Sequence, residues 1–434
     1  MSTPDRRTFV KAAAAAVATA RFPILGANDR INVGIVGVGG RGRDHVNAYN
    51  SLDPDCRISA ICDVNQAARE RATAMVRKAK GYDPKDYADM RRMFESKDVD
   101  AVSIATPNHW HALSTIWACQ AGKDVYVEKP VSHNIFEGAQ MVKAARKYNR
   151  IVQSGTQSRS IPVFMRAMKA LESGAIGPVY HARGLCFRRR LSIGHTPDEP
   201  VPAGIDWDLF LGPAQLKPYS KNKFAYNWHW FWDTGNGDIG NQGAHQMDIC
   251  LWGLPRAGWP VSAASTGGKY LWKDDQETPN TLQTSLLFGD AQITFDTRNL
   301  PTPTEALAPV RPNYTGNIFF GADGFMTLDN RGFEIYIGPK YEKTAEDHPK
   351  GKETEDAAHM KNFLDAVRAR NYKLLNADIE VGARSAAFCH LANIAYRAGH
   401  QLEIDTATGR FKADPAANAL LTRDYRKPYV VPAF

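Results

Sequence analysis

The sequence predicts two joined domains: an α/β domain built on a doubly wound parallel sheet, then an α+β domain with a mostly antiparallel open sheet and flanking helices. Up to residue 153, short apolar runs alternate with longer amphipathic runs. Strands separated by helices need crossover connections, which produce a parallel sheet. After residue 153, strand-like runs follow one another through short turns, which favours antiparallel pairing. The 434 residues suffice for two or three domains of ordinary size.

The strand-like runs of the first half are short and apolar, as expected for strands that are covered on both faces. The runs between them have the length and pattern of amphipathic helices. We expect strands at residues 31–36, 57–62, 99–104, 124–127 and 151–153, with helices at 44–52, 65–80, 110–121 and 135–148.

The second half begins with a helix and then changes character. Short turns such as Phe288-Gly289-Asp290-Ala291 join neighbouring strand-like runs, as in a hairpin. We expect a helix at 163–172, strands at 179–187, 262–272, 281–288, 291–297, 317–320 and 325–328, and two final helices at 354–370 and 379–399.

The N-terminal residues 1–27 are predicted to be a twin-arginine export signal. Arg6 and Arg7 precede a short alanine-rich stretch that ends in the small-x-small pattern of a signal peptidase site at Ala20, with a second possible site after Ala27. The alternative is a basic amphipathic helix. We therefore expect a periplasmic or other extracytoplasmic protein that is exported folded, with domains at 28–153 and 154–434.

The charge balance argues against a nucleic acid partner. The formal net charge is +8, from 54 Lys and Arg against 46 Asp and Glu, and the predicted signal carries a net +3 of it. The remaining charge is small for a chain of this length, and no nucleic-acid-binding motif accompanies it. No apolar run reaches the roughly 20 residues of a membrane span. The six cysteines form no C-x-x-C pair, so we expect them to be buried, with any disulfide pairing left open.

The first strand ends in Gly37-Val38-Gly39-Gly40-Arg41-Gly42, a complete G-x-G-x-x-G. In such a loop one glycine makes the tight turn, one lets a pyrophosphate approach the backbone, and one lets the helix pack on the strand. Asp63 ends the second strand 21 positions after Gly42, where a ribose-binding carboxylate is expected. This carboxylate favours NAD over NADP because it repels a 2′-phosphate, although Arg41 could partly offset it.

The third and fourth strands end in Ala105-Thr106-Pro107-Asn108-His109-Trp110-His111 and Glu128-Lys129-Pro130. With the glycine loop, these motifs resemble the glucose-fructose oxidoreductase and inositol dehydrogenase family, Gfo/Idh/MocA, over nearly the whole chain after residue 27. The resemblance implies a first domain that holds NAD or NADP and a second whose open sheet faces the substrate and often forms a dimer or tetramer. It also implies that the cofactor is contacted by Thr106, Asn108, His111, Glu128 and Lys129.

The resemblance further assigns two catalytic positions. Lys129 would lie beside the reacting hydroxyl, where a cation stabilises developing alkoxide character. The family segment G-G-G-x-L-x-D-x-G-x-H corresponds to residues 235–245, so His245 would take the hydroxyl proton. Asn241 stands where the family has Asp. An amide can form hydrogen bonds but cannot carry charge, which puts a simple Lys-Asp-His proton relay in doubt.

Candidate substrate contacts are Arg159, Arg188, Trp230 and His245. Trp230 belongs to an aromatic run at 227–233 that could pack against a sugar ring or simply fill the core. Arg188 begins a run of three arginines that could bind a carboxylate or phosphate, or could be a solvated charge run. We expect no metal site, because the spacing of the histidines matches no standard ligand motif.

Together these observations predict a NAD-dependent oxidoreductase that acts on a secondary hydroxyl of a sugar, glycoside or cyclitol and holds its cofactor tightly. An alternative is a NAD-dependent glycosidase or lyase, in which transient oxidation permits elimination and the hydride then returns. A third possibility is a sugar-binding protein that keeps NAD only as a structural component.

Overall fold

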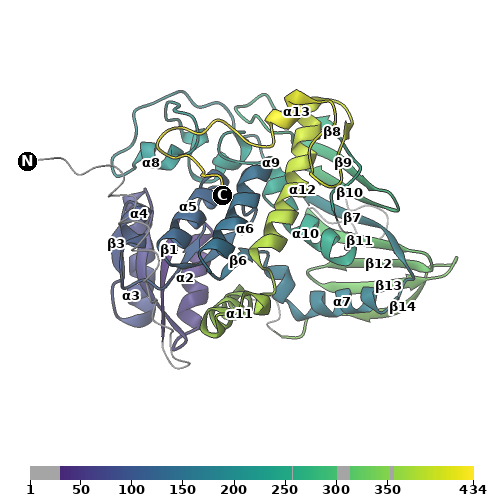
Figure 1. Ribbon diagram of the computed structural model, residues 1–434, viewed down its shortest axis with the longest axis horizontal. Helices are drawn as coiled ribbons and strands as arrows, with labels where there is room; N and C mark the ends of the chain where they lie inside the picture. Colours follow the sequence, from purple (N-terminus) through teal and green to yellow (C-terminus); the bar gives the residue numbers. More distant parts are fainter. Residues whose placement is uncertain (1–29, 257, 301–312, 352–355) are drawn as a thin grey trace, which may run out of the picture.

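The computed structural model describes residues 30–256, 258–300, 313–351 and 356–434. The predicted export signal at 1–27 therefore lies outside the described residues. Two sheets, one of six strands and one of nine, stand side by side with helices between and around them (Figure 1). No helix of the described residues is long and apolar enough to cross a membrane.

The first sheet is parallel throughout and has the strand order β3-β2-β1-β4-β5-β6. The order reverses between β1 and β4, and a crevice at the carboxyl ends of the strands is expected at such a reversal. The predicted doubly wound domain is confirmed. Its strands are β1 (Ile31–Val36), β2 (Cys56–Cys62), β3 (Lys85–Tyr87), β4 (Ala101–Ile104), β5 (Asp124–Glu128) and β6 (Val152–Gly155).

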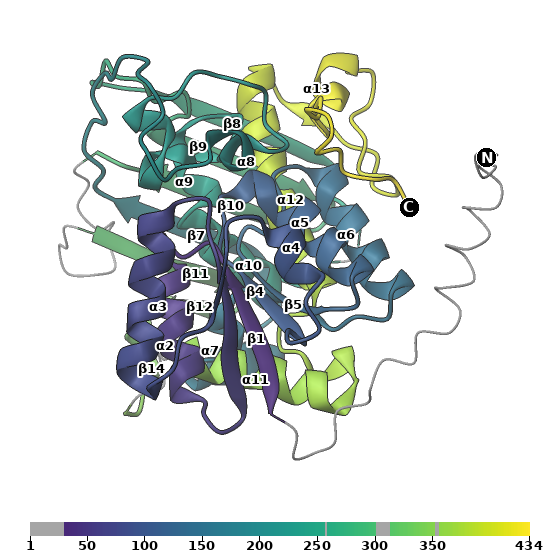
Figure 2. The same ribbon diagram turned by 90° about the vertical axis from the view of Figure 1, so that its left-hand side faces the viewer.

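Five helices connect these strands and lie against the first sheet (Figure 2). Strand β3 and helix α4 were not predicted, because β3 is a three-residue, largely exposed edge strand and α4 a single short turn. Strand β6 continues two residues past the predicted domain boundary at 153. The helices are α2 (Gly42–Ser51), α3 (Gln66–Lys80), α4 (Met90–Phe94), α5 (Asn108–Gln120) and α6 (Ile135–Lys147).

The second sheet has the order β14-β13-β12-β11-β7-β10-β9-β8-β15 and is antiparallel except for the pair β7 and β10. The mostly antiparallel sheet is thus confirmed. Its strands are β7 (Val179–Arg188), β8 (Ser262–Gly268), β9 (Thr281–Phe288), β10 (Ala291–Arg298), β11 (Asn313–Gly321), β12 (Gly324–Asp329), β13 (Gly332–Ile337), β14 (Glu342–Asp347) and β15 (Leu402–Glu403).

The two faces of the second sheet differ. Helices α7 (Pro162–Glu172), α10 (Gly243–Gly253) and α12 (Ile379–Ala398) cover one face and form the main core with it (Figure 1). The opposite face carries a smaller apolar cluster that includes Leu185, Phe187 and Phe325. Helix α10 was not predicted because it is buried on nearly all sides and lacks the polar face that marks a surface helix.

The C-terminal third of the chain joins the two domains. Helix α12 packs on α6 and β6 of the first domain as well as on α10 and β8 of the second. Helix α11 (Asp356–Ala369) packs into the first domain, where the rings of Phe363 and Tyr126 meet edge to face. The final residues return to α5, where Tyr429 packs against Trp110. The first domain is therefore built from two separate parts of the sequence.

Short helices and turns build the segments between β7 and β8 and around the ends of the other helices. They are η1 (Gln157–Ser160), α8 (Trp207–Leu211), η2 (Lys221–Lys223), η3 (Ala225–Trp230), α9 (Gly237–Gly240), η4 (Tyr372–Leu374) and α13 (Pro415–Ala419).

Candidate active site

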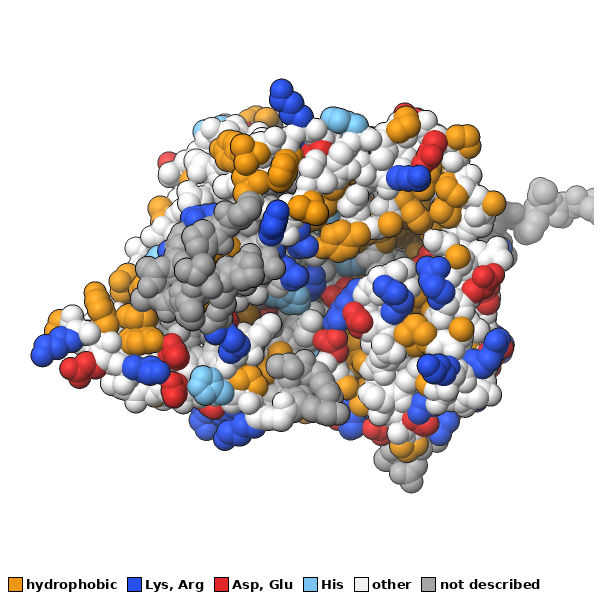
Figure 3. All heavy atoms as spheres, turned by 180° about the vertical axis from the view of Figure 1, so that it is seen from behind, with side chains coloured by type: hydrophobic (Ala, Val, Ile, Leu, Met, Phe, Trp, Pro, Cys, Tyr) orange, Lys and Arg blue, Asp and Glu red, His pale blue; other side chains and the backbone are white. Residues whose placement is uncertain are grey.

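A cavity of about 570 Å³ lies at the carboxyl ends of β1, β2, β4 and β5, against the segment 224–241 of the second domain. Figure 3 shows a hollow on one face of the molecule with basic and histidine side chains around it. Most of the residues predicted from the sequence line this cavity: Gly37, Gly39, Gly40, Arg41, Asp63, Thr106, Asn108, His111, Glu128, Lys129 and Asn241. Trp228, a member of the aromatic run at 227–233, also lines it, as does Tyr226, to which the sequence did not point.

The glycines of the loop have two different roles. A Cβ on Gly42 would lie 1.9 Å from the Gly37 carbonyl oxygen, and Gly37 itself has a φ of +82°. These two glycines are required by the turn. A Cβ on Gly39 would meet nothing nearer than 4.0 Å, and one on Gly40 would meet nothing within 4 Å. The space beside Gly39 and Gly40 is open, as the approach of a pyrophosphate to the backbone requires.

Asp63 and Thr106 also fit a bound dinucleotide. The Asp63 carboxylate accepts hydrogen bonds from the backbone N–H groups of Val38 at 2.7 Å and Asn65 at 2.9 Å, and burial raises its pKa. Each carboxylate oxygen keeps a second lone pair for a ribose hydroxyl. Thr106 has a buried Oγ1 with no hydrogen-bond partner among the described residues. A buried hydroxyl without a partner indicates a missing ligand or water.

Arg41 does not offset Asp63, contrary to the expectation from the sequence. Its Nε donates to Glu128 at 2.9 Å, and its Nη1 pairs with Asp356 at 2.6 Å. Burial disfavours the ionised form of Glu128, but Arg41 and His45 outweigh burial and hold the Glu128 pKa well below its usual range. Arg41 is thus neutralised within the protein, which leaves the preference of Asp63 for NAD in place.

Asn108 and His111 hold the walls of the cavity through their own hydrogen bonds. Asn108 donates from Nδ2 to the side-chain oxygen of Asn236 at 2.9 Å. The two ring nitrogens of His111 lie 2.7 Å from the carbonyl oxygens of Pro130 and Thr106, and burial lowers the pKa of this histidine. These contacts connect α5 to the loop that follows Lys129 and to the segment that leads to Asn241.

Lys129 reaches from the first domain to the second. It follows β5, and its Nζ donates to the backbone oxygen of Asn241 at 3.0 Å. Burial lowers the pKa of Lys129 and, with Arg41 and Arg190, outweighs the opposing effect of the carboxylates of Glu128 and Asp238. The ammonium lies in the cavity wall and has a neutral carbonyl, not a carboxylate, as its hydrogen-bond partner.

Asn241 lies between α9 and α10, and His245 follows in the first turn of α10. Burial, together with the positive charges of Lys129, Arg41 and Arg188, lowers the pKa of His245 to about 3. The imidazole is therefore neutral at neutral pH and able to accept a proton. His245 is partly exposed and is not among the residues that line the cavity.

Trp230 is not placed to receive a sugar. It is 3% exposed, and the Arg190 guanidinium lies 5.4 Å from its ring. Of the two interpretations of the aromatic run, core packing therefore holds for this residue. In this part of the chain the rings that line the cavity include those of Phe224, Tyr226 and Trp228, with His229 stacked on Trp228 at a ring-centre distance of 3.5 Å. Sequence alone gave no basis for choosing among neighbouring aromatic residues.

The two predicted arginines have partners within the protein. Arg159 pairs with the buried carboxylate of Asp248 at 2.8 Å and lies over the ring of Trp252, outside the cavity lining. Arg188 donates to the side-chain oxygen of Gln242 at 2.5 Å. Arg159 thus anchors α10 through Asp248, whereas Arg188 lies near His245 and has a neutral hydrogen-bond partner.

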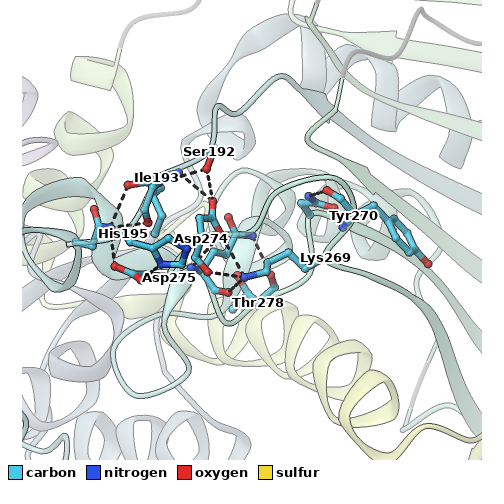
Figure 4. A network of polar contacts seen from close by, with 12 residues as sticks. Ser192, Ile193, His195, Lys269, Tyr270, Asp274, Asp275 and Thr278 are labelled. Carbon is cyan, nitrogen blue, oxygen red and sulfur yellow. Dashed lines mark hydrogen bonds and ion pairs between the residues drawn. The ribbon is translucent and has the colours of Figure 1, made fainter. Parts of the chain in front are cut away.

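A polar network outside the cavity holds the segment after β7 in place (Figure 4). The Asp274 carboxylate accepts from Ser192 Oγ at 2.9 Å and from the Ile193 N–H at 3.0 Å. Asp275 accepts from Asn222 at 2.9 Å, and Asn222 lies in η2 just before η3. The network therefore supports the element that carries Tyr226 and Trp228, although no motif in the sequence indicated it.

All six cysteines are buried and unpaired: Cys56, Cys62, Cys119, Cys186, Cys250 and Cys389. The disulfide pairing left open by the sequence is therefore not present.

Two family profiles match the chain. Residues 31–156 match the NAD-binding Rossmann fold of the oxidoreductase family, and residues 188–261 and 329–431 match its C-terminal alpha/beta domain. A Rossmann domain with an open glycine loop, joined to such a second domain, defines a two-domain NAD-binding protein of the oxidoreductase class. The chain belongs to the Gfo/Idh/MocA family.

Individual relatives differ in their activities. The chain is 28% identical over 219 residues to a glycosyl hydrolase family 109 protein of Saccharopolyspora erythraea, covering 49% of this chain and 42% of the relative. It is 30% identical over 163 residues to an inositol 2-dehydrogenase/D-chiro-inositol 3-dehydrogenase of Shouchella clausii, covering 37% and 45%. Each match thus spans less than half of the relative's length.

A solved structure of levoglucosan dehydrogenase in complex with NADH has the same fold. It superposes with a TM-score of 0.67 at 17% sequence identity and covers 87% of this chain and 100% of the other.

Proposed function

We propose that this chain is a NAD-dependent oxidoreductase that acts on a secondary hydroxyl of a sugar, glycoside or cyclitol. The observation that carries the proposal is Lys129, a partly buried residue that lines the same cavity as the glycine loop and reaches the segment leading to His245. The inositol and levoglucosan dehydrogenases among its relatives support this substrate class.

The side chains around Lys129 suit oxidation of an alcohol. When bound, NAD supplies the acceptor for the hydride that leaves the carbinol carbon. Lys129 donates a hydrogen bond to the reacting oxygen and stabilises negative charge as it develops. His245, neutral because of its low pKa, accepts the hydroxyl proton. The alcohol loses one hydride and one proton and becomes a ketone.

The cofactor would be held by backbone and side-chain groups that have room or hydrogen-bonding capacity left for it. Gly39 and Gly40 would admit the pyrophosphate, Asp63 would accept from a ribose hydroxyl, and Thr106 would use its unpaired hydroxyl. We propose NAD in preference to NADP because the Asp63 carboxylate is not neutralised by Arg41.

Replacement of Lys129 by Ala tests the proposal. We expect turnover to fall by roughly 100-fold or more, because the variant loses both the charge and the hydrogen bond to the reacting oxygen. Binding of NAD, followed by calorimetry, should stay within about twofold of the wild type. Undiminished oxidation of the sugar by the variant would contradict the assignment.

A second candidate is cleavage of a glycoside through transient oxidation. Relatives described as glycosyl hydrolase family 109 proteins support it, as does Asn241, which departs from the usual dehydrogenase pattern. Dehydrogenation and glycoside cleavage both begin with hydride transfer from the hydroxyl-bearing carbon beside Lys129. They differ in the product, which is an oxidised sugar in the first case and a cleaved glycoside in the second. Release of the aglycone without a lasting change in nicotinamide absorbance would identify the second.

We further propose that the protein is exported through the twin-arginine signal and works outside the cytoplasm with its cofactor tightly bound. The paired Arg6 and Arg7 and the following alanine-rich stretch support this. Replacing both arginines by lysine should retain the protein in the cytoplasmic fraction. Equal export of the variant would contradict the proposal.

We also propose a homo-oligomer that forms through the face of the second sheet that no helix of the described residues covers. On this face Phe325 stacks on Tyr336 at 4.7 Å, beside the exposed rings of Tyr180 and Tyr341. A second copy of this chain would cover the apolar rings. Light scattering should give a dimer or tetramer, and Tyr180→Glu combined with Tyr341→Glu should shift it toward monomer.

A further inference from the structure

Tyr226 occupies an unusual position for a large aromatic residue. It lines the cavity, yet it is 50% exposed, while Trp230 of the same short helix is buried. The preceding Ala225 has a φ of +50°, a left-handed conformation that costs a non-glycine residue of order 1 kcal/mol. The strained backbone starts η3 and carries Tyr226 at the cavity wall.

Asn241 holds the hydroxyl of this tyrosine. Its Nδ2 donates to Tyr226 Oη at 3.0 Å and to Asp238 Oδ1 at 3.3 Å. Asp238 is 1% exposed and pairs with Arg190 at 2.8 Å. A carboxylate paired with a guanidinium only accepts hydrogen bonds, so it fixes the Asn241 amide with its NH₂ toward Tyr226.

Because Asn241 is the donor in this hydrogen bond, the hydroxyl proton of Tyr226 is free to be donated to another acceptor. Tyr226 Oη accepts from Asn241, and no group of the described residues accepts the Tyr226 O–H. An aspartate at position 241 would reverse the bond, because a carboxylate would take the phenolic proton. The amide at Asn241 therefore frees the O–H to donate into the cavity.

Lys129 also forms a hydrogen bond with Asn241, but with its backbone and not with its side chain. Its ammonium donates to the backbone oxygen of Asn241, while Tyr226 is held by the side chain of Asn241. One residue thus positions two donors at one cavity wall. Consider a substrate with several hydroxyl groups on one ring, one of which reacts and contacts Lys129. Another oxygen of the same ring can then accept a hydrogen bond from the Tyr226 hydroxyl.

We propose that Tyr226 contacts the substrate: its O–H, oriented by Asn241, donates to an oxygen of a polyhydroxylated ring beside the hydroxyl held by Lys129. This inference rests on the proposed function. It assigns to Asn241 a positioning role toward the substrate in place of the proton relay of an aspartate. No proton transfer to or from Tyr226 is involved.

Replacing Tyr226 by Phe removes the hydroxyl and keeps the ring. With levoglucosan, myo-inositol or D-glucose as the probe, we expect kcat/KM to fall about tenfold, mostly through KM, as for the loss of one hydrogen bond to the substrate. NAD affinity and Tm should match the wild type. Tyr270→Phe is the matched control, because Tyr270 is also 50% exposed but lies outside the cavity lining.

The variant Asn241→Asp separates a substrate contact from a structural role. Alone it should also lower kcat/KM, because the new carboxylate captures the Tyr226 O–H. In the double variant with Tyr226→Phe, the two losses should not add, since both remove the same contact. Unchanged kcat/KM in Tyr226→Phe, additive losses, or a matching loss of NAD affinity or Tm would overturn the proposal.

The same variants distinguish failure of the inference from failure of the proposed function. If the wild type oxidises none of the three probes, the proposed function fails for them. Calorimetry of each probe with the NAD-loaded wild type and with Tyr226→Phe then decides the inference. Weaker binding to the variant supports the contact, and equal binding or no binding to either protein overturns it.

Discussion

At the scale of single residues, the fold controls ionisation at the candidate active site by burial and by the surrounding positive charges. Lys129, Arg41 and Arg188 all disfavour a second positive charge on His245, whose pKa burial already lowers. Among the residues that the structure describes, the carboxylate that hydrogen-bonds to Asn241 is that of Asp238, and Arg190 neutralises it. The positive charges consequently stabilise negative charge beside Lys129 and keep His245 unprotonated before the reaction begins.

This electrostatic arrangement predicts the pH dependence of the free enzyme, which kcat/KM reports. His245 has a pKa of about 3, so it stays unprotonated and competent as a base throughout the range from pH 5 to 7. We expect the kcat/KM profile to show no acidic inflection near pH 6.5. An inflection near that pH that disappears in His245→Gln would contradict the assignment.

The residue scale is also where sequence analysis was least complete. The glycine loop and Asp63 were found because fixed spacing relates them to strand ends, and Lys129 was found through the family resemblance of its Glu-Lys-Pro motif. The structure brings them to one cavity. Trp230 was chosen within the aromatic run at 227–233, where adjacent aromatic residues look alike in a sequence, and Tyr226 lies just before that run. Which of them is exposed depends on the φ of Ala225 and on contacts with distant residues.

At the scale of elements, the glycine loop between β1 and α2 combines a tightly packed turn with an open surface where a pyrophosphate can approach the backbone. Gly37 and Gly42 pack backbone against backbone, whereas Gly39 and Gly40 face open space. The motif therefore contains glycines required for folding and glycines required for binding.

Alanine substitutions at Gly39 and Gly42 should separate these two roles. Gly39→Ala adds a Cβ with no close neighbour, so we expect Tm to change little while NAD affinity falls at least about tenfold. Gly42→Ala places a Cβ 1.9 Å from the Gly37 carbonyl oxygen and should destabilise the protein by more than about 2 kcal/mol. Urea unfolding and NAD calorimetry measure both effects, and equal behaviour of the two variants would contradict this division.

The elements themselves were predicted unevenly. Strands β1, β2 and β5 were located within a residue or so, because buried parallel strands are short apolar runs bounded by polar residues. Strands β13 and β14 were missed, since β14 is almost entirely exposed and polar. Helix α10 was missed for the opposite reason, because burial on nearly all sides removes the amphipathic pattern.

At the scale of the whole molecule, the two domains are joined by elements of the C-terminal third of the chain that pack against the first domain. Buried histidines lie at several of these joints. His109 contacts the carbonyl oxygens of Thr234 and Phe210, His359 contacts Ser154 and Ser160, and His390 contacts Ser132. None of these contacts was predictable, because each joins residues far apart in the sequence.

The buried histidines predict loss of stability in mild acid. Burial lowers the pKa of His109, His359 and His390 to about 4, against about 6.5 in the unfolded chain. Between pH 6.5 and 4 the unfolded state binds protons that the folded state does not. The free energy of unfolding should therefore be at its full value above pH 6.5 and fall by several kcal/mol toward pH 4.

Urea titrations at several pH values within this range measure the effect. His390→Gln removes one of the buried histidines that titrate and should make the dependence on pH shallower. A free energy of unfolding that stays constant from pH 6.5 to 4.5 would contradict the prediction.

The most direct test of the account is the absorbance of reduced nicotinamide when the purified protein is mixed with levoglucosan, myo-inositol, D-glucose and simple glycosides, first without and then with added NAD. We predict a lasting rise that depends on Lys129, together with an oxidised sugar. Absence of any rise or cleavage with every compound, although NAD binds, would contradict the assignment of the cavity as a sugar-oxidising site.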